Sequence, residues 1–155
     1  MSWTNFDGLL VRFGTEKGAV RVDGVQHVEK EVLVYKIADA TALGNTDTAA
    51  PVADEAYLPA GSIILKALFV VDTAFTSGGS AVLDLGLKQA AGTNIDDDGL
   101  DAAIAVASLT ANAGINGDGA LVGTKLANDS YIMATYDTAA FTAGAGRLIV
   151  EYTRA

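Results

Sequence analysis

The residues that could do chemistry in this chain are few. His27 is the only histidine, and no Gly-x-Ser-x-Gly nucleophile turn accompanies it. The chain has no cysteine, which excludes a thiol nucleophile, a disulfide scaffold and a Cys-ligated metal site. A lone histidine is far more typical of a surface or hydrogen-bonded residue than of a catalytic base. The sequence therefore predicts a protein that is not an enzyme, with no catalytic residues and no cofactor.

An acidic run over residues 94–99 (NIDDDG) is the other candidate for chemistry. Oxygen ligands at alternate positions before a glycine are typical of the opening of a calcium loop, but the twelfth position holds Ala105 instead of a bidentate Glu. The alternative is a turn that caps a helix, with Asp98 as the N-cap. Apolar residues recur after it at helical spacing: Leu100, Ile104 and Ala107. We predict one short helix here and no metal site, with the calcium interpretation left open.

The charge and composition of the chain limit the classes of partner that it could bind. Acidic residues outnumber basic ones by 19 to 10, which gives the 155-residue chain a net charge of −9. Nucleic acid and anionic membranes are disfavoured as partners, because binding to either needs clustered Lys and Arg. Hydrophobic residues make up 50% of the chain, and its length suits one domain with its own core. No leader peptide or membrane-spanning segment is predicted.

Glycines separate short runs rich in β-forming residues, a pattern typical of an all-β domain. Strands are predicted at 31–37, 62–72, 80–88, 130–136 and 147–153. In the strand at 62–72 one face is wholly apolar: Ile63, Leu65, Ala67, Phe69 and Val71. The opposite face is also apolar apart from Lys66. A strand of this kind is covered on both faces, and in a small sandwich the second cover is often another subunit.

The N-terminal segment is predicted to be an arm or hairpin over residues 1–30, ahead of a sandwich domain over 31–155. Residues 9–13 and 19–22 are its β-like runs. Its apolar side chains belong either to the core or to an anchor on another chain, because interfaces are enriched in Trp and Phe. The long stretch 39–61 has little predicted structure and could follow a neighbouring subunit. The candidate contacts with another subunit or another partner chain are Trp3, Phe6, Leu9, Leu10, Phe13 and Tyr57.

Residues 72–79 (DTAFTSGG) and 137–144 (DTAAFTAG) echo each other, and each follows one apolar strand and precedes another. Each is predicted to be a hairpin connection whose Phe turns back while the glycines supply positive φ. The two segments fit equivalent corners of a two-sheet sandwich. Convergent turn chemistry is the alternative explanation.

The order of several short motifs over residues 52–155 resembles a known family. The motifs are LPAGSII at 58–64, TAFT at 73–76, LDLGL at 83–87, DGL at 98–100, GALVGT at 119–124, FTAG at 141–144 and VEY at 150–152. In this order they resemble the small auxiliary capsid proteins of tailed bacteriophages, the cement or decoration proteins, in particular cyanophage-like ones.

The resemblance implies a jelly-roll-like antiparallel β-sandwich, in most cases a homotrimer, on the outside of an icosahedral capsid. Such a protein is made in the host cytoplasm and then becomes part of the virion. Its partners would be copies of itself and the phage major capsid protein, whose neighbouring subunits it cements. The alternative function is a head-fibre or tail-fibre adhesin or a carbohydrate-binding module, because a β-sandwich also serves those purposes.

Overall fold

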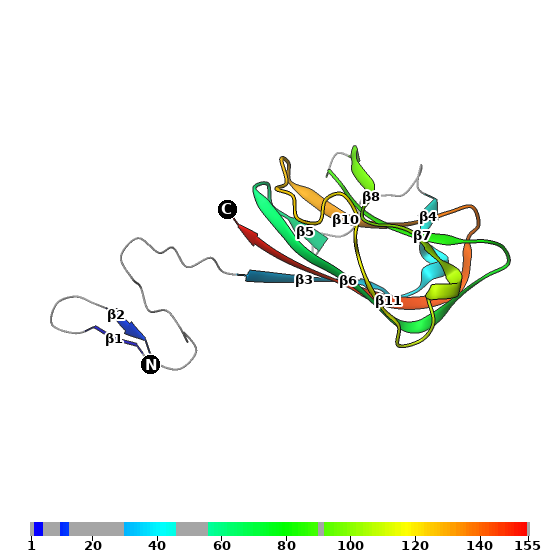
Figure 1. The fold of residues 1–155 in the computed structure, drawn as a ribbon, viewed down its shortest axis with the longest axis horizontal. Helices are drawn as coiled ribbons and strands as arrows, with labels where there is room; N and C mark the ends of the chain where they lie inside the picture. The colour runs from blue at the N-terminus through cyan, green and yellow to red at the C-terminus, as the bar shows by residue number, and fades with distance from the viewer. Residues whose placement is uncertain (1, 5–9, 13–29, 46–55, 90–91, 155) are drawn as a thin grey trace.

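A computed structural model describes residues 2–4, 10–12, 30–45, 56–89 and 92–154 of the chain. Within these ranges, two β-sheets pack face to face as a sandwich (Figure 1). The prediction of an all-β sandwich is therefore confirmed. Among the described residues, no helix is long and apolar enough to cross a membrane.

Two sheets, named I and II here, make the sandwich. Their strands in chain order are β3 (Lys30–Ile37), β4 (Gly44–Asn45), β5 (Tyr57–Leu58), β6 (Ser62–Ser77), β7 (Val82–Lys88), β8 (Asn94–Ala105), β9 (Gly114–Asn116), β10 (Ser130–Asp137) and β11 (Phe141–Arg154). Sheet I has the order β4-β10-β7-β8, with β5 also paired to β10, and sheet II has the order β3-β11-β6-β9. The β4–β10 pair is parallel, and the other pairs are antiparallel. Most connections pass from one sheet to the other, as in a jelly roll, among them β6–β7, β8–β9 and β10–β11.

The core lies between the two sheets. Sheet I contributes leucines from alternate positions of β7, and sheet II contributes aromatic rings from β6 and β11. The ring of Phe75 makes edge contacts with Phe141, at 5.2 Å between centroids, and with Phe69, at 5.9 Å. Edge-to-face pairs of this kind stabilise a core by about 0.5–1.5 kcal/mol beyond the burial of their area.

The predicted faces of β6 are right only from residue 67 onward. Before that point Ile64 is fully buried, whereas Leu65 is 47% exposed and Ile63 is partly exposed. The cause is a β-bulge: the pairing with β11 shifts register beside Glu151, and Leu65 has no partner in it. An extra residue in one strand reverses which alternate side chains point inward.

The predicted short helix after Asp98 is wrong. Residues there form β8, and a single 3₁₀ turn at Val106–Ser108 follows it. Leu100 and Ile104 do reach the core, but from an irregular strand whose pairing with β7 shifts register three times. A strand with bulges can bury residues four apart, so the helical spacing of these side chains was misleading. The helix that follows a calcium loop of the helix–loop–helix type is likewise absent here, whereas calcium binding by the acidic run itself stays a hypothesis.

The two echoing segments lie at corners of the sandwich, as predicted, and they pair with each other. Ser77 of β6 is the register partner of Phe141 in β11, and the Ser77 hydroxyl donates to the Ala140 carbonyl at 2.9 Å. Each segment leads from one sheet to the other and the strands that it joins are not paired with each other, so the prediction of hairpin connections is wrong. Positive φ occurs at Thr138 and Gly144, and not at the glycine pair 78–79.

Replacing Gly144 with alanine should destabilise the fold. Gly144 is buried with φ +142°, and a Cβ there would lie 2.5 Å from the Phe75 ring. Backbone strain and overpacking together should lower the free energy of unfolding by about 2–4 kcal/mol, measured by urea denaturation. Gly78→Ala is the matched control, because nothing lies within 4 Å of its added methyl group. Equal midpoints for the two variants would contradict the proposed packing at this corner.

Candidate functional site

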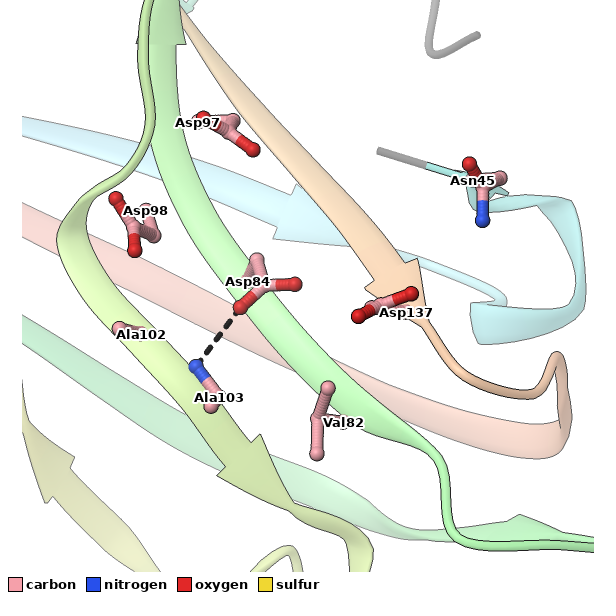
Figure 2. Close-up of a pocket in the computed structure, with 8 residues that line it drawn as sticks. All are labelled: Asn45, Val82, Asp84, Asp97, Asp98, Ala102, Ala103 and Asp137. Atoms are coloured by element: carbon pink, nitrogen blue, oxygen red, sulfur yellow. Dashed lines mark hydrogen bonds between the residues drawn. The ribbon is translucent and has the colours of Figure 1, made fainter. Parts of the chain in front are cut away.

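Four carboxylates gather in a hollow of about 450 Å³ on the side of sheet I that faces away from the core. This acidic hollow is lined by residues from four strands: Asn45 of β4, Val82 and Asp84 of β7, Asp97, Asp98, Ala102 and Ala103 of β8, and Asp137 of β10. Figure 2 shows Asp84 between the side chains of Asp98 and Asp137. The hollow concentrates negative charge from segments that are far apart in the sequence.

A close crossing of β8 over β7 creates the hollow. The crossing occurs at Gly86, where an added Cβ would collide with the backbone of Asp96 and Asp97. Glycine is the one residue that lets two backbones approach this closely. Because β8 folds over β7 at Gly86, the side chains of Asp97 and Asp98 come to the same side of the sheet as Asp84.

Burial and the charge of neighbouring carboxylates raise the pKa values of Asp84 and Asp96. Asp84 is 8% exposed, and its Oδ1 accepts a hydrogen bond from the Ala103 N–H at 2.8 Å. Burial raises the pKa of Asp84, and the nearby charges of Asp98 and Asp137 raise it further. Burial, and then a hydrogen bond with Asp98, raise the pKa of Asp96. Carboxylates placed so closely resist full ionisation unless a cation or a basic group balances them.

Asp101 of β8 is a further buried carboxylate close to this region. It is 6% exposed, and its Oδ2 atom has no hydrogen-bond partner among the described residues. Burial, followed by the charge of Asp118, raises the pKa of Asp101 to about 6. A buried carboxylate oxygen without a partner is costly when ionised, so this group takes up a proton at a higher pH than an ordinary aspartate does.

The chemistry open to the acidic hollow is the attraction of cations. Carboxylate oxygens of Asp96, Asp97 and Asp98 lie within 4.8 Å of one another, which is close enough to share one hard cation such as Ca²⁺. The residues that line the hollow include no imidazole and no hydroxyl group. The geometry therefore suits ionic contact with a cation or with a basic protein surface.

The sequence singled out the run 94–99 but did not connect it with Asp84 or Asp137. In the sequence, alternation over residues 80–88 places Asp84 on the polar side of a strand, and Asp137 opens one of the echoing segments. The signal that could have joined them is the glycine in the middle of β7, at position 86, which marks a close backbone approach.

The structure places two of the N-terminal contact candidates in a small third sheet. β1 (Ser2–Thr4) and β2 (Leu10–Arg12) pair antiparallel, with Trp3 opposite Val11 and Thr4 opposite Leu10. Phe6, Leu9 and Phe13 lie outside the described residues, as do His27 and residues 19–22. The role of this segment as an arm that contacts another chain stays a prediction.

Tyr57, the remaining contact candidate, lies on the surface and is held in place. It belongs to β5, is 38% exposed, and its ring centroid lies 5.5 Å from that of Tyr131. Its hydroxyl donates to Asp129 Oδ1 at 2.9 Å, and this bond raises the pKa of Tyr57. The same Asp129 oxygen accepts the Ala60 N–H at 2.8 Å. An exposed but immobilised aromatic ring suits a protein contact, because little side-chain entropy remains to be lost.

The outer face of sheet II has the opposite character to the acidic hollow. It carries exposed Val32 and Val34 together with four cations, Lys30, Lys36, Lys66 and Arg147. Two of the cations are paired: Lys30 with Glu151 at 2.6 Å, and Arg147 with Asp72 at 2.8 Å. Exposed pairs of this kind contribute at most about 1 kcal/mol each to stability. The partly apolar outer face of sheet II is therefore the less acidic side of a strongly acidic protein.

Comparison with known proteins finds similarity in fold. No protein-family model matches the chain, and no curated protein matches it in sequence. A chain in the solved structure of the cyanophage Pam1 capsid asymmetric unit is 18% identical with a TM-score of 0.59, over 91% of this chain and 98% of that one. A chain in the capsid of Ralstonia phage GP4 is 16% identical with a TM-score of 0.52, over 87% of this chain and 89% of that one. The same sandwich therefore occurs, nearly whole, in two phage capsids.

Replacing Asp101 with asparagine should change how stability depends on pH. Because the folded protein holds Asp101 at a pKa of about 6, above its ordinary value of 3.8, the folded state binds this proton more tightly than the unfolded chain. The contribution of Asp101 to the free energy of unfolding therefore falls as the pH rises from about 4 to about 6. We compare the free energy of unfolding of Asp101→Asn with that of the parent by urea denaturation. The difference should shift in favour of the variant by on the order of 2 kcal/mol between pH 4 and pH 7.5.

Asp118→Asn is the matched control for this measurement. Asp118 is exposed and raises the pKa of Asp101 only through its charge, so its removal should give a smaller change of the same sign. A stability difference between Asp101→Asn and the parent that is equal at both pH values would contradict the raised pKa.

Proposed function

We propose that this chain is a structural virion protein that binds the outside of an assembled phage capsid and cements neighbouring major-capsid-protein subunits, acting as a homotrimer. The observation that carries the proposal is the similarity in fold, over almost the whole chain, to chains in two phage capsids. The order of the motifs over residues 52–155 points to the same class of protein from the sequence. Fold alone does not assign function, so the charge and the surface features of the protein must also agree with the proposed function.

Charge supports a place on the exterior of the capsid. Packaged DNA fills the interior with phosphate, and a chain with a net charge of −9 would be repelled there. The acidic hollow strengthens this argument, because it concentrates at least four carboxylates on one face of the folded sandwich. On the outside, the same charge keeps copies soluble until they reach the shell. The chain needs no disulfide, which suits folding in a host cytoplasm before assembly.

The mechanism of cementing is mass action. A protein that binds the assembled shell and does not bind free subunits stabilises the assembled state by the free energy of its own binding. A trimer that contacts several capsid subunits at once adds weak contacts together through their high effective concentration. Surfaces available for such contacts are the exposed Tyr57 ring, the partly apolar outer face of sheet II and the N-terminal segment.

Removal of residues 1–13 should weaken capsid binding while the sandwich still folds. The described sandwich begins with β3 at Lys30, so the deletion removes no strand of sheet I or sheet II. Co-sedimentation with empty shells assembled from the major capsid protein of the same phage measures the occupancy, and we expect at least a tenfold loss of affinity. Urea denaturation of the truncated chain provides the folding control. Unchanged occupancy would remove the N-terminal segment from the proposed contact.

The native mass tests the homotrimer. Light scattering near neutral pH should give about three times the chain mass of 15.8 kDa, because the partly apolar outer face of sheet II favours burial between copies. Measurement at two protein concentrations controls for weak association. A single-chain mass at both concentrations would contradict a preformed trimer and favour either assembly on the shell or a monomeric binding module.

A further inference from the structure

The two sheets have four edges, and the edge formed by β3 differs from the other three. A sheet edge presents unpaired N–H and C=O groups, and natural proteins shorten, distort or cover such edges. In sheet I, the strand β4 at one edge is two residues long, and β8 at the other is interrupted by three register shifts. In sheet II, β9 is three residues long. These three edges are therefore poor templates for a further strand.

The segment that follows β8 also covers the edges it passes. Along β8, the Gly119 N–H donates to the Leu100 carbonyl at 3.1 Å, and the Leu121 N–H donates to the Gly99 carbonyl at 2.8 Å. The same segment continues along β6 on either side of β9. For example, the Gly123 N–H donates to the Ile64 carbonyl at 2.7 Å. The backbone groups on those two edges are thus used within the chain.

The β3 edge has none of this protection. β3 is eight residues long and pairs with β11 without a register shift, from Lys30 opposite Thr153 to Ile37 opposite Gly146. Among the described residues, no strand or loop pairs with its other side. Its outward side chains include Val32 and Val34, which are 57% and 51% exposed. A regular, apolar, open strand edge is a surface for strand addition.

We propose that the occupant of this edge is β3 of a second copy, paired antiparallel about a two-fold axis at Val34. Side chains on the same face can be paired only if the two residue numbers add to an even number, which leaves few registers. A register centred on Leu33 would place Lys30 opposite Lys36, and like charges directly opposite each other are destabilising. The register centred on Val34 places Val32 opposite Lys36 and sets no two like charges directly opposite.

The same register joins sheet II of one copy to sheet II of the other and completes an apolar row across the combined sheet. Val34 is the partner of Ile149 in β11, and Ile149 is the partner of Leu68 in β6. Pairing Val34 with its own counterpart joins two such rows into six apolar side chains across an eight-stranded sheet. Cross-strand apolar pairs of this kind are the unit of sheet stabilisation. Charge and apolar contact thus select one register.

This contact is independent of the proposed capsid function and of the proposed trimer. Two-fold pairing of β3 cannot form the three-fold contacts within a trimer, so it would join copies that belong to different trimers. A protein that holds neighbouring positions on a lattice together needs such a contact between different trimers. The experiment therefore reads β3 pairing directly, without using capsids or the native mass.

Single-cysteine variants test the register, because the chain has no cysteine of its own. In Val34→Cys, the two Cβ atoms would lie about 5 Å apart, close to the separation that a disulfide needs. In the matched control Val32→Cys, they would lie about 13 Å apart along the strands. We expect oxidation of the purified full chain to give a disulfide-linked two-chain band for Val34→Cys, and at least tenfold less for Val32→Cys. Both side chains are exposed, so both variants should fold, which urea denaturation checks.

Charge at position 32 provides a second, independent readout. In the proposed register, residue 32 faces Lys36 of the second copy. Added to Val34→Cys, Val32→Glu should increase the yield of the linked species and Val32→Lys should decrease it, each by at least threefold and less so at high salt. No linked species, equal yields for the two cysteine positions, or no dependence on the charge at 32 would each overturn the proposal.

Discussion

The pairing of β6 with β11 is the contact on which the rest of the sandwich depends. These are the two longest strands, and they form the centre of sheet II, with β3 on one side and β9 on the other. Each strand also continues from sheet II into a connection to sheet I, through the two echoing corners. The contact between Phe75 and Phe141 joins those corners inside the core. Loss of this one pairing would therefore remove the centre of sheet II and separate the two corners through which β6 and β11 continue to sheet I.

The two outer faces of the sandwich differ in charge because different strands supply them. Sheet I gathers Asp84, Asp97, Asp98 and Asp137 in the acidic hollow, whereas the outer face of sheet II holds four cations beside exposed valines. The net charge of −9 hides this asymmetry. Two faces of unlike charge favour one orientation when the domain approaches a charged surface. Two contacts of opposite chemistry on opposite faces can therefore be used at the same time.

The sequence predicted best where a strand is regular. Alternation identified β3, where burial of one face fixes a period of two, and it identified β7, where leucines alternate with polar residues and glycine although both faces are buried. It failed at Leu65 and over 94–105, because a bulge depends on the partner strand, which lies elsewhere in the chain. The acidic hollow was missed for the same reason: Asp84 and Asp137 come together only through pairing of β7 with β10. The three carboxylates at 96–98 were found because they are adjacent in sequence.

The position of β11 has a consequence for the order of folding. β11 is the last described strand, yet it lies between β3 and β6 and pairs with both, including pairs such as Glu31 with Tyr152. Sheet II therefore cannot form until β11 has been synthesised, because this central strand emerges after all the other described strands. Contacts between residues so distant in sequence also make folding slow, since a long loop must close before they are made. Until β11 pairs with them, the apolar faces of β3 and β6 stay exposed to solvent. The negative charge of the chain limits association between these incompletely folded forms.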